Sequence, residues 1–155
     1  MPDESLLTDE IRALQGQATP MLPVEVTLRA VQRAMDVYLG NHDGAPTAQG
    51  AVVPGYVLAA LDSESEPPPL PTLLPNSLLI SNEWSFERPL RLGETLEVAY
   101  RITAISERFG GRFGYSIDFR TEDEFIDSTG AVVARSARDM MQYDAAEARD
   151  GGGDA

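Results

Sequence analysis

The sequence Leu-Glu-Val-Ala-Tyr-Arg-Ile-Thr-Ala at positions 96–104 decides the fold of this chain. Its even-numbered residues are apolar or aromatic, whereas its odd-numbered residues are mostly charged or polar. Successive side chains of a β-strand point to opposite faces, so a period of two is typical of a strand that buries one face only. We therefore expect a strand with one buried face and one solvent-exposed face.

The same pattern recurs on both sides of this stretch. Glycine pairs and Thr-Gly steps, which favour tight turns, separate the repeats. The predicted strands are 79–88, the alternating segment around 115–120 and the last segment 131–143, with turns at Gly110-Gly111 and Thr129-Gly130. The second half of the chain is therefore predicted to be a meander of long antiparallel strands.

The first half has helical spacing instead. After a short helix predicted at 7–14 and a short strand at 24–26, Thr27 is placed as an N-cap and Gly40 as the end of a helix. The apolar face of an antiparallel sheet must be buried by another element, and only the helical segment 27–61 is available to pack on it. We predict an α+β domain over residues 1–143 in which the sheet wraps around a helix. The Pro-rich segment 62–75 is predicted to be an irregular surface loop, and residues 144–155 an acidic disordered tail.

Composition excludes several classes of function. The net charge of −13 argues against binding nucleic acid or anionic membranes. The chain has neither cysteine nor lysine, which excludes thiolate metal sites, cysteine nucleophiles and Schiff bases. No apolar stretch is long enough to span a membrane and the N-terminus does not resemble a secretory signal, so a cytoplasmic location is expected.

Several short motifs resemble, in order and spacing, those of MaoC-like hot-dog dehydratases. They are Val24-Glu25-Val26-Thr27, Tyr38-Leu39-Gly40-Asn41, Pro54-Gly55-Tyr56, Arg88-Pro89-Leu90, Leu92-Gly93-Glu94-Thr95-Leu96 and the segment 129–135. More narrowly, the chain is similar to the N-terminal, dehydratase-type domain of the fungal fatty-acid-synthase class. The resemblance covers roughly residues 6–143 and implies a hot-dog fold.

The resemblance also implies a chemistry. The family hydrates trans-2-enoyl thioesters or dehydrates 3-hydroxyacyl thioesters, in fatty acid or steroid metabolism, with coenzyme A or an acyl carrier protein as the carrier. It implies no metal and no cofactor beyond that carrier. By position, Asn41, Pro54, Gly55, Tyr56 and Arg88 are the candidate substrate-binding residues.

The catalytic Asp/His pair of the family is missing from its expected loop. Active relatives place the His five residues after the Asp, but aligning the loop on Gly40 puts Asn41 in the Asp position and Pro46 in the His position. His42, the sole histidine, directly precedes Asp43, and these two are only weak candidates for catalysis. Loss of a positioned general acid or base costs roughly 10²–10⁴ in rate.

Three functions remain open at this stage. The first is a non-catalytic or weakly catalytic subunit that pairs with a catalytic hot-dog paralogue and shapes the acyl channel. The second is a self-sufficient hot-dog enzyme, either a hydratase that uses His42 or Asp43, or an acyl-CoA thioesterase that uses a carboxylate. The third is a non-enzymatic module that binds acyl thioesters. A hot-dog sheet exposes an edge, so a homodimer or heteromer is expected.

Overall fold

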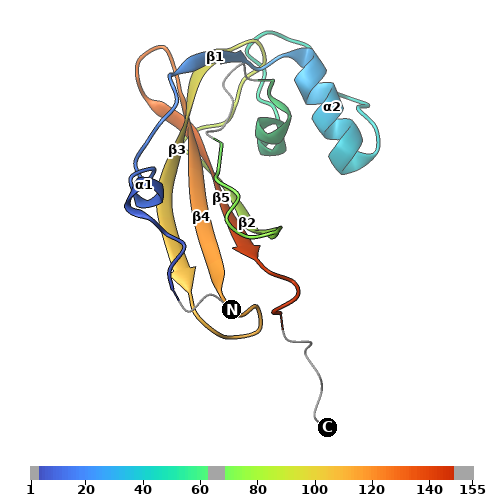
Figure 1. The fold of residues 1–155 in the computed structure, drawn as a ribbon. Coiled ribbons are helices and arrows are strands. Elements are labelled where there is room, and N and C mark those ends of the chain that lie inside the picture. Colours follow the sequence, from blue (N-terminus) through green and yellow to red (C-terminus); the bar gives the residue numbers. More distant parts are fainter. Residues whose placement is uncertain (1–3, 63–68, 149–155) are drawn as a thin grey trace.

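The computed structural model describes residues 4–62 and 69–148. Their secondary structure follows the predicted order of helices first and a strand meander second (Figure 1). The elements are α1 (Asp9–Arg12), β1 (Leu22–Glu25), α2 (Leu28–Leu39), the 3₁₀ helix η1 (Gly55–Ala60), β2 (Asn76–Phe86), β3 (Thr95–Arg108), β4 (Ser116–Ile126) and β5 (Val132–Tyr143). No helix in the described ranges is long and apolar enough to cross a membrane.

One five-stranded antiparallel sheet forms the frame of the molecule, in the order β1-β3-β4-β5-β2. Three extensive strand pairings, β3 with β4, β4 with β5 and β5 with β2, form a strongly curved surface (Figure 1). The short strand β1 and the long strand β2 lie at its two edges. The predicted α+β architecture is therefore confirmed.

The boundaries of α2 follow from its two caps. Oγ1 of Thr27 accepts a hydrogen bond from the backbone N–H of Ala30 at 3.1 Å, which satisfies an amide that has no partner inside the helix. Gly40 ends the helix with a φ of 77°, a left-handed conformation that favours glycine. Both positions agree with the sequence prediction. The predicted helix at 7–14 is reduced to the single turn of α1, capped by Thr8.

The helix that the resemblance places after Pro54-Gly55-Tyr56 is short. It is the 3₁₀ helix η1, which has no side-chain cap at Pro54 and begins with a glycine, a poor helix former. The chain leaves it in an extended conformation at Leu61. η1 packs against α2 and carries the buried side chains Val57 and Leu58, so the two helices share the task of covering the sheet.

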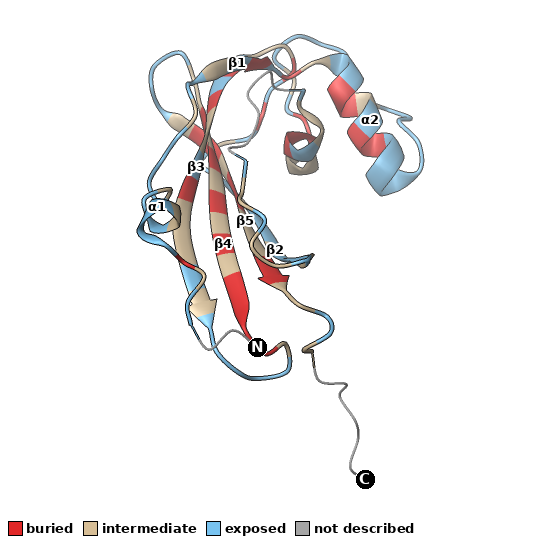
Figure 2. Cartoon of the chain, viewed as in Figure 1, coloured by how far each residue is buried: buried red, intermediate tan, exposed pale blue. Residues whose placement is uncertain are grey.

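Two separate apolar clusters lie on the same face of the sheet, which we call the inner face. The larger one joins α2 and η1 to Phe125 of β4 and to its neighbours. The smaller one joins Leu7 to Tyr115, Ile117 and Phe119, near the opposite end of the strands. Burial alternates along β4 (Figure 2). Phe119 and Phe125 therefore face inward, and Thr121 and Asp123 lie between them on the same face.

Leucines of the loop before β2 complete the smaller cluster. Gln142 of β5 anchors this loop, since its Oε1 accepts from the N–H groups of Leu73 (2.8 Å) and Leu74 (3.2 Å) and its Nε2 donates to the carbonyl of Pro71 (2.7 Å). The predicted irregular loop is thus held on the inner face over residues 69–75. Residues 63–68 of the prediction, and residues 149–155 of the predicted tail, lie outside the described ranges, whereas 144–148 form turns.

Replacing Gln142 by Leu should lower the free energy of unfolding by about 2–3 kcal/mol, because partly buried backbone groups of the loop lose their partners. Urea denaturation measures the change. Gln17→Leu is the matched control: the exposed Gln17 side chain makes one 3.4 Å bond to Ala13, and its loss should stay within about 0.5 kcal/mol. Equal losses in the two variants would contradict the anchoring role.

Candidate functional site

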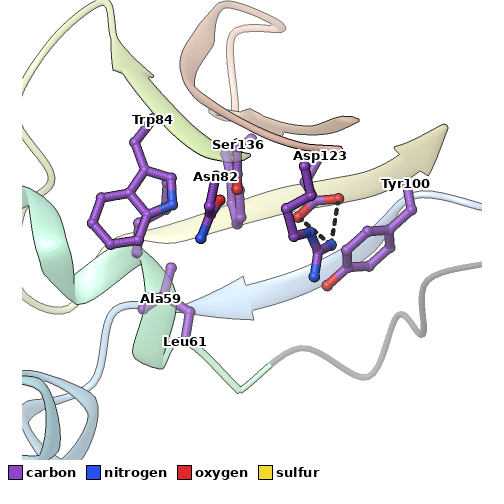
Figure 3. A pocket seen from close by; sticks show the side chains of 10 residues that line it. Ala59, Leu61, Asn82, Trp84, Tyr100, Asp123 and Ser136 are labelled. Carbon is purple, nitrogen blue, oxygen red and sulfur yellow. Dashed lines mark hydrogen bonds and ion pairs between the residues drawn. The ribbon is translucent and has the colours of Figure 1, made fainter. Parts of the chain in front are cut away.

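A pocket of about 190 Å³ lies between η1 and the inner face of the sheet, at the junction of the two apolar clusters (Figure 3). Its walls come from five elements or their ends. They are Leu58, Ala59 and Leu61 on the side of η1, and Asn82, Trp84, Tyr100, Asp123, Phe125, Ser136 and Arg138 on the sheet. Two larger hollows lie elsewhere on the described surface, and neither is lined by a buried charged residue.

The register of the sheet brings the polar wall together. Tyr100, Asp123, Ser136 and Trp84 form one row across β3, β4, β5 and β2, because each is the direct cross-strand partner of the next. Directly opposite residues lie about 5 Å apart, so a row is a contiguous strip of side chains. Arg138 stands in the adjacent row, also on the inner face.

Asp123 is the only charged residue classed as buried in the described part of the chain. Its carboxylate accepts from Nη2 of Arg138 at 3.1 Å and 3.3 Å. Burial raises the pKa of Asp123 from 3.8 to about 6, and the guanidinium of Arg138 opposes this shift. The pocket therefore contains an ion pair whose carboxylate takes up a proton more readily than an exposed aspartate does.

Arg138 has hydrogen-bonding capacity to spare. Its Nε is buried and has no hydrogen-bond partner among the described residues, and its Nη1 likewise makes no bond to them. An unpaired buried donor costs about 1–3 kcal/mol, so native structures retain few of them. Arg138 therefore retains donors that no described residue satisfies.

A carboxylate–imidazole pair that the sequence analysis missed joins the last turn of α2 to the loop that follows it. Nδ1 of His42 lies 2.8 Å from Oδ1 of Asp36, and both side chains are about half exposed. The Gly40 cap folds the chain back so that the loop meets the last turn of α2, a proximity that the left-handed glycine could have indicated. Asn41 and Asp43 form an Asx turn instead, with a 3.0 Å bond from the Asp43 N–H to the Asn41 side chain.

His42 and Asp43 do not line the pocket, and their predicted catalytic role stays a prediction. The same holds for Asn41 as a ligand. A carboxylate that orients an imidazole leaves the other ring nitrogen free to move a proton, so Asp36 and His42 can in principle serve as a base. Among the described residues, no group of three or more His, Asp or Glu side chains is placed to hold a metal ion.

The Pro54-Gly55-Tyr56 segment opens η1 beside the pocket. Gly55 is packed so tightly on the ring of Phe86 that an added Cβ would lie 3.1 Å from it, which gives the glycine a structural role. The ring of Tyr56 stacks on Tyr38 at 4.8 Å between centroids, and Tyr38 meets Trp84 edge-on at 6.5 Å. These aromatic contacts connect the end of α2, the start of η1 and the edge strand β2.

Arg88 was predicted as a substrate-binding residue, and the structure places it in an ion pair. Its guanidinium binds both carboxylate oxygens of Glu94, at 2.7 Å and 3.1 Å, and lies 3.7 Å from Asp127. A bidentate pair of this kind occupies two of the donors that would otherwise face a phosphate. Its role toward a substrate therefore stays a prediction.

Comparisons with known proteins identify the fold. No protein family model and no curated protein sequence matches the chain. Among solved structures, it is similar to a C-terminally truncated HadBC (3R-hydroxyacyl-ACP dehydratase) complex from Mycobacterium tuberculosis, with a TM-score of 0.58 at 16% identity over 88% of this chain and 99% of that one.

Two further structures agree. A MaoC-like dehydratase from Rhodospirillum rubrum gives a TM-score of 0.53 at 17% identity, covering 88% of this chain and 94% of that one. A Mycobacterium tuberculosis protein with a double hotdog fold gives 0.52 at 14% identity, covering 91% of this chain and 46% of that one. The chain therefore has the hot-dog fold of MaoC-like dehydratases, as the resemblance implied, while the narrower fungal subfamily stays a prediction.

The raised pKa of Asp123 predicts a specific pH dependence. Between about pH 4 and 6 the folded protein binds this proton more readily than the unfolded chain, so its stability falls as the pH rises through that window. Asp123→Asn removes the effect. The stability of the wild type relative to this variant should therefore fall by up to about 3 kcal/mol between pH 4 and pH 7. Denaturation of both proteins at several pH values measures it, and a pH-independent difference would contradict it.

Proposed function

We propose that this chain is the non-catalytic, substrate-channel subunit of an enoyl-thioester hydratase or 3-hydroxyacyl-thioester dehydratase, paired with a catalytic hot-dog paralogue. The observation that carries the proposal is the edge strand β2, which pairs only with β5 among the described strands and carries exposed apolar side chains. Leu78, Leu79 and Ile80 are consecutive and 43%, 50% and 51% exposed. Such a strand in a soluble protein calls for a partner, because its unpaired backbone would otherwise favour aggregation.

The exposed apolar surface of β2 extends onto the end of α2. Phe86 of β2 and Val37, Tyr38 and Leu39 at the end of α2 are also exposed, and the Tyr38 ring joins the two elements through its contact with Trp84. Exposed aromatic and aliphatic side chains of this kind are typical of interfaces. A second hot-dog sheet that paired with β2 would extend the sheet and bury both parts of this surface.

The comparisons support a heteromeric assembly. HadBC, which is described as a complex, is similar to this chain over nearly the full length of the matched subunit. The double hotdog protein carries about two such units in one chain, since this chain spans 46% of it. In both proteins, the complex and the double hotdog chain, one hot-dog unit is paired with another. We propose that this chain also pairs with a second hot-dog unit.

The division of labour follows from the two candidate sites. The loop with His42 is exposed and lacks the family's Asp/His spacing, whereas the pocket beside β2 is half enclosed by η1. We infer that the paralogue supplies the Asp and His that add water across the enoyl double bond, and that this chain holds part of the acyl group. Coenzyme A or an acyl carrier protein carries the thioester.

A mutation on β2 tests the assembly. Ile80→Lys should shift the protein toward the monomer at micromolar concentration, because it places a charge on the surface that pairing would bury. Sedimentation velocity of the chain alone, and of its complex with the paralogue, measures the shift. Ser106→Lys, at an exposed position of β3, is the control and should leave assembly unchanged. A wild-type monomer that also fails to bind hot-dog paralogues would overturn the proposal.

Hydration of crotonyl-CoA tests the chemistry. The chain alone should show no turnover above background, whereas its complex with a paralogue that carries an intact Asp-x₄-His loop should turn over at about 1–10³ per second. His42→Ala in this chain should leave the activity of the complex unchanged. Turnover at that rate by the chain alone would contradict the proposal.

A second candidate, a self-sufficient hydratase or acyl-CoA thioesterase, is favoured by the 2.8 Å contact between Asp36 and His42. If the chain alone is active, loss of activity in both Asp36→Asn and His42→Ala would assign the chemistry to this pair. Release of free thiol from acyl-CoA would identify the thioesterase. Acyl-thioester binding without turnover, alone or with partners, would leave a non-enzymatic binding module.

A further inference from the structure

The pocket beneath η1 presents donors and acceptors that the protein itself does not use. Nη1 of Arg138 and the side-chain amide of Asn82 make no hydrogen bond to another described residue, whereas Nε of Arg138 is buried and also lacks a partner there. The carboxylate of Asp123 accepts only from Arg138 in the described part of the chain, although a carboxylate can accept about four hydrogen bonds. Donors and an acceptor therefore lie side by side in one pocket.

The other walls of the pocket are apolar. Leu58 of η1 and Leu61 just after it line one side, and Trp84 and Phe125 lie beside the polar residues on the sheet. At about 190 Å³ the pocket is large enough for a small ring, since an apolar cavity of about 150 Å³ binds benzene. Its occupant must combine an apolar body with one polar group.

Charge decides the nature of that polar group. Asp123 and Arg138 neutralise each other, so an anionic ligand would add an uncompensated charge beside Asp123 in a chain that already carries a net charge of −13. A hydrocarbon would strip water from the ion pair and return no hydrogen bond. A hydroxyl group can accept from Arg138 and donate to Asp123 at the same time.

We propose that the pocket between η1 and the sheet binds a neutral apolar group that carries a hydroxyl, with the Asp123–Arg138 pair as the specificity-determining element. One extension rests on the proposed function. If the complex acts on an acyl thioester, the part of the acyl chain that reaches this pocket carries a hydroxyl group. A chain without this hydroxyl group would then be the poorer substrate.

The test uses small probes on the full chain, so that it does not depend on catalysis. Trp84 is the sole tryptophan, and its indole N–H gives one NMR signal that reports directly on the pocket. Benzyl alcohol should bind at least about tenfold more tightly than toluene, because a hydrogen bond to a charged group contributes that much or more. Benzoate should bind more weakly than benzyl alcohol. Equal binding of benzyl alcohol and toluene, tighter binding of benzoate, or no binding of any probe would overturn the proposal.

Two variants sharpen the result. The double variant Asp123→Leu/Arg138→Leu replaces the pair with apolar side chains, a change that folded proteins often tolerate, and should reverse the preference so that toluene binds better. Ala59→Phe fills the pocket from its exposed side without touching the pair and should abolish binding of benzyl alcohol. Ala131→Phe, at an exposed alanine in the turn before β5, is the control and should bind like the wild type.

The two proposals fail separately. Selective benzyl alcohol binding, combined with no hydration by any complex, would keep the pocket and remove the hydratase function. Hydration by a complex, combined with binding of toluene and benzyl alcohol that is equal or survives Ala59→Phe, would keep the function and remove the hydroxyl-specific pocket.

Discussion

The rest of the structure depends on one constraint: the inner face of a long curved sheet must be covered. In the described part of the chain its helical cover consists of α2 and a 3₁₀ segment of six residues, η1. Burial of apolar side chains is the main favourable term in folding, so the uncovered part cannot stay bare. α2 supports η1 at one end, while the N-terminal segment and the loop held by Gln142 cover the other end. In the described part of the chain, Asp123 lies in the pocket between these two covers.

The pocket between the covers is where a charged pair lies on the inner face. A continuous helix would have placed apolar side chains over the middle of β4, where a buried carboxylate is costly. The short cover leaves a pocket instead, and there the partly exposed Arg138 can both neutralise Asp123 and face a ligand. The pKa of Asp123 is raised because the desolvation of its carboxylate in the pocket outweighs the attraction to Arg138.

Much of the fold could be predicted from local patterns, because alternation, caps and turns depend on neighbours in the sequence. Thr27, Gly40 and the turn at Gly110-Gly111 lie where the sequence placed them. The pocket could not be predicted in this way. The sequence pattern does not distinguish Asp123 from the other acidic residues of its strand. Only the register, which pairs it with Ser136 and brings it near Arg138, shows that it faces inward. The contact between Asp36 and His42 depends likewise on how Gly40 turns the chain.

The pocket and the proposed interface share the strand β2, and this links specificity to assembly. Asn82 and Trp84 line the pocket, while Ile80 and Phe86 of the same strand are exposed at the free edge of the sheet. A partner that paired with β2 would fix the strand that forms one wall of the pocket. It would also exclude water from the neighbouring ion pair and so strengthen every polar contact made there. Ligand selection would then be a property of the assembled pair, even though its polar groups all come from this chain.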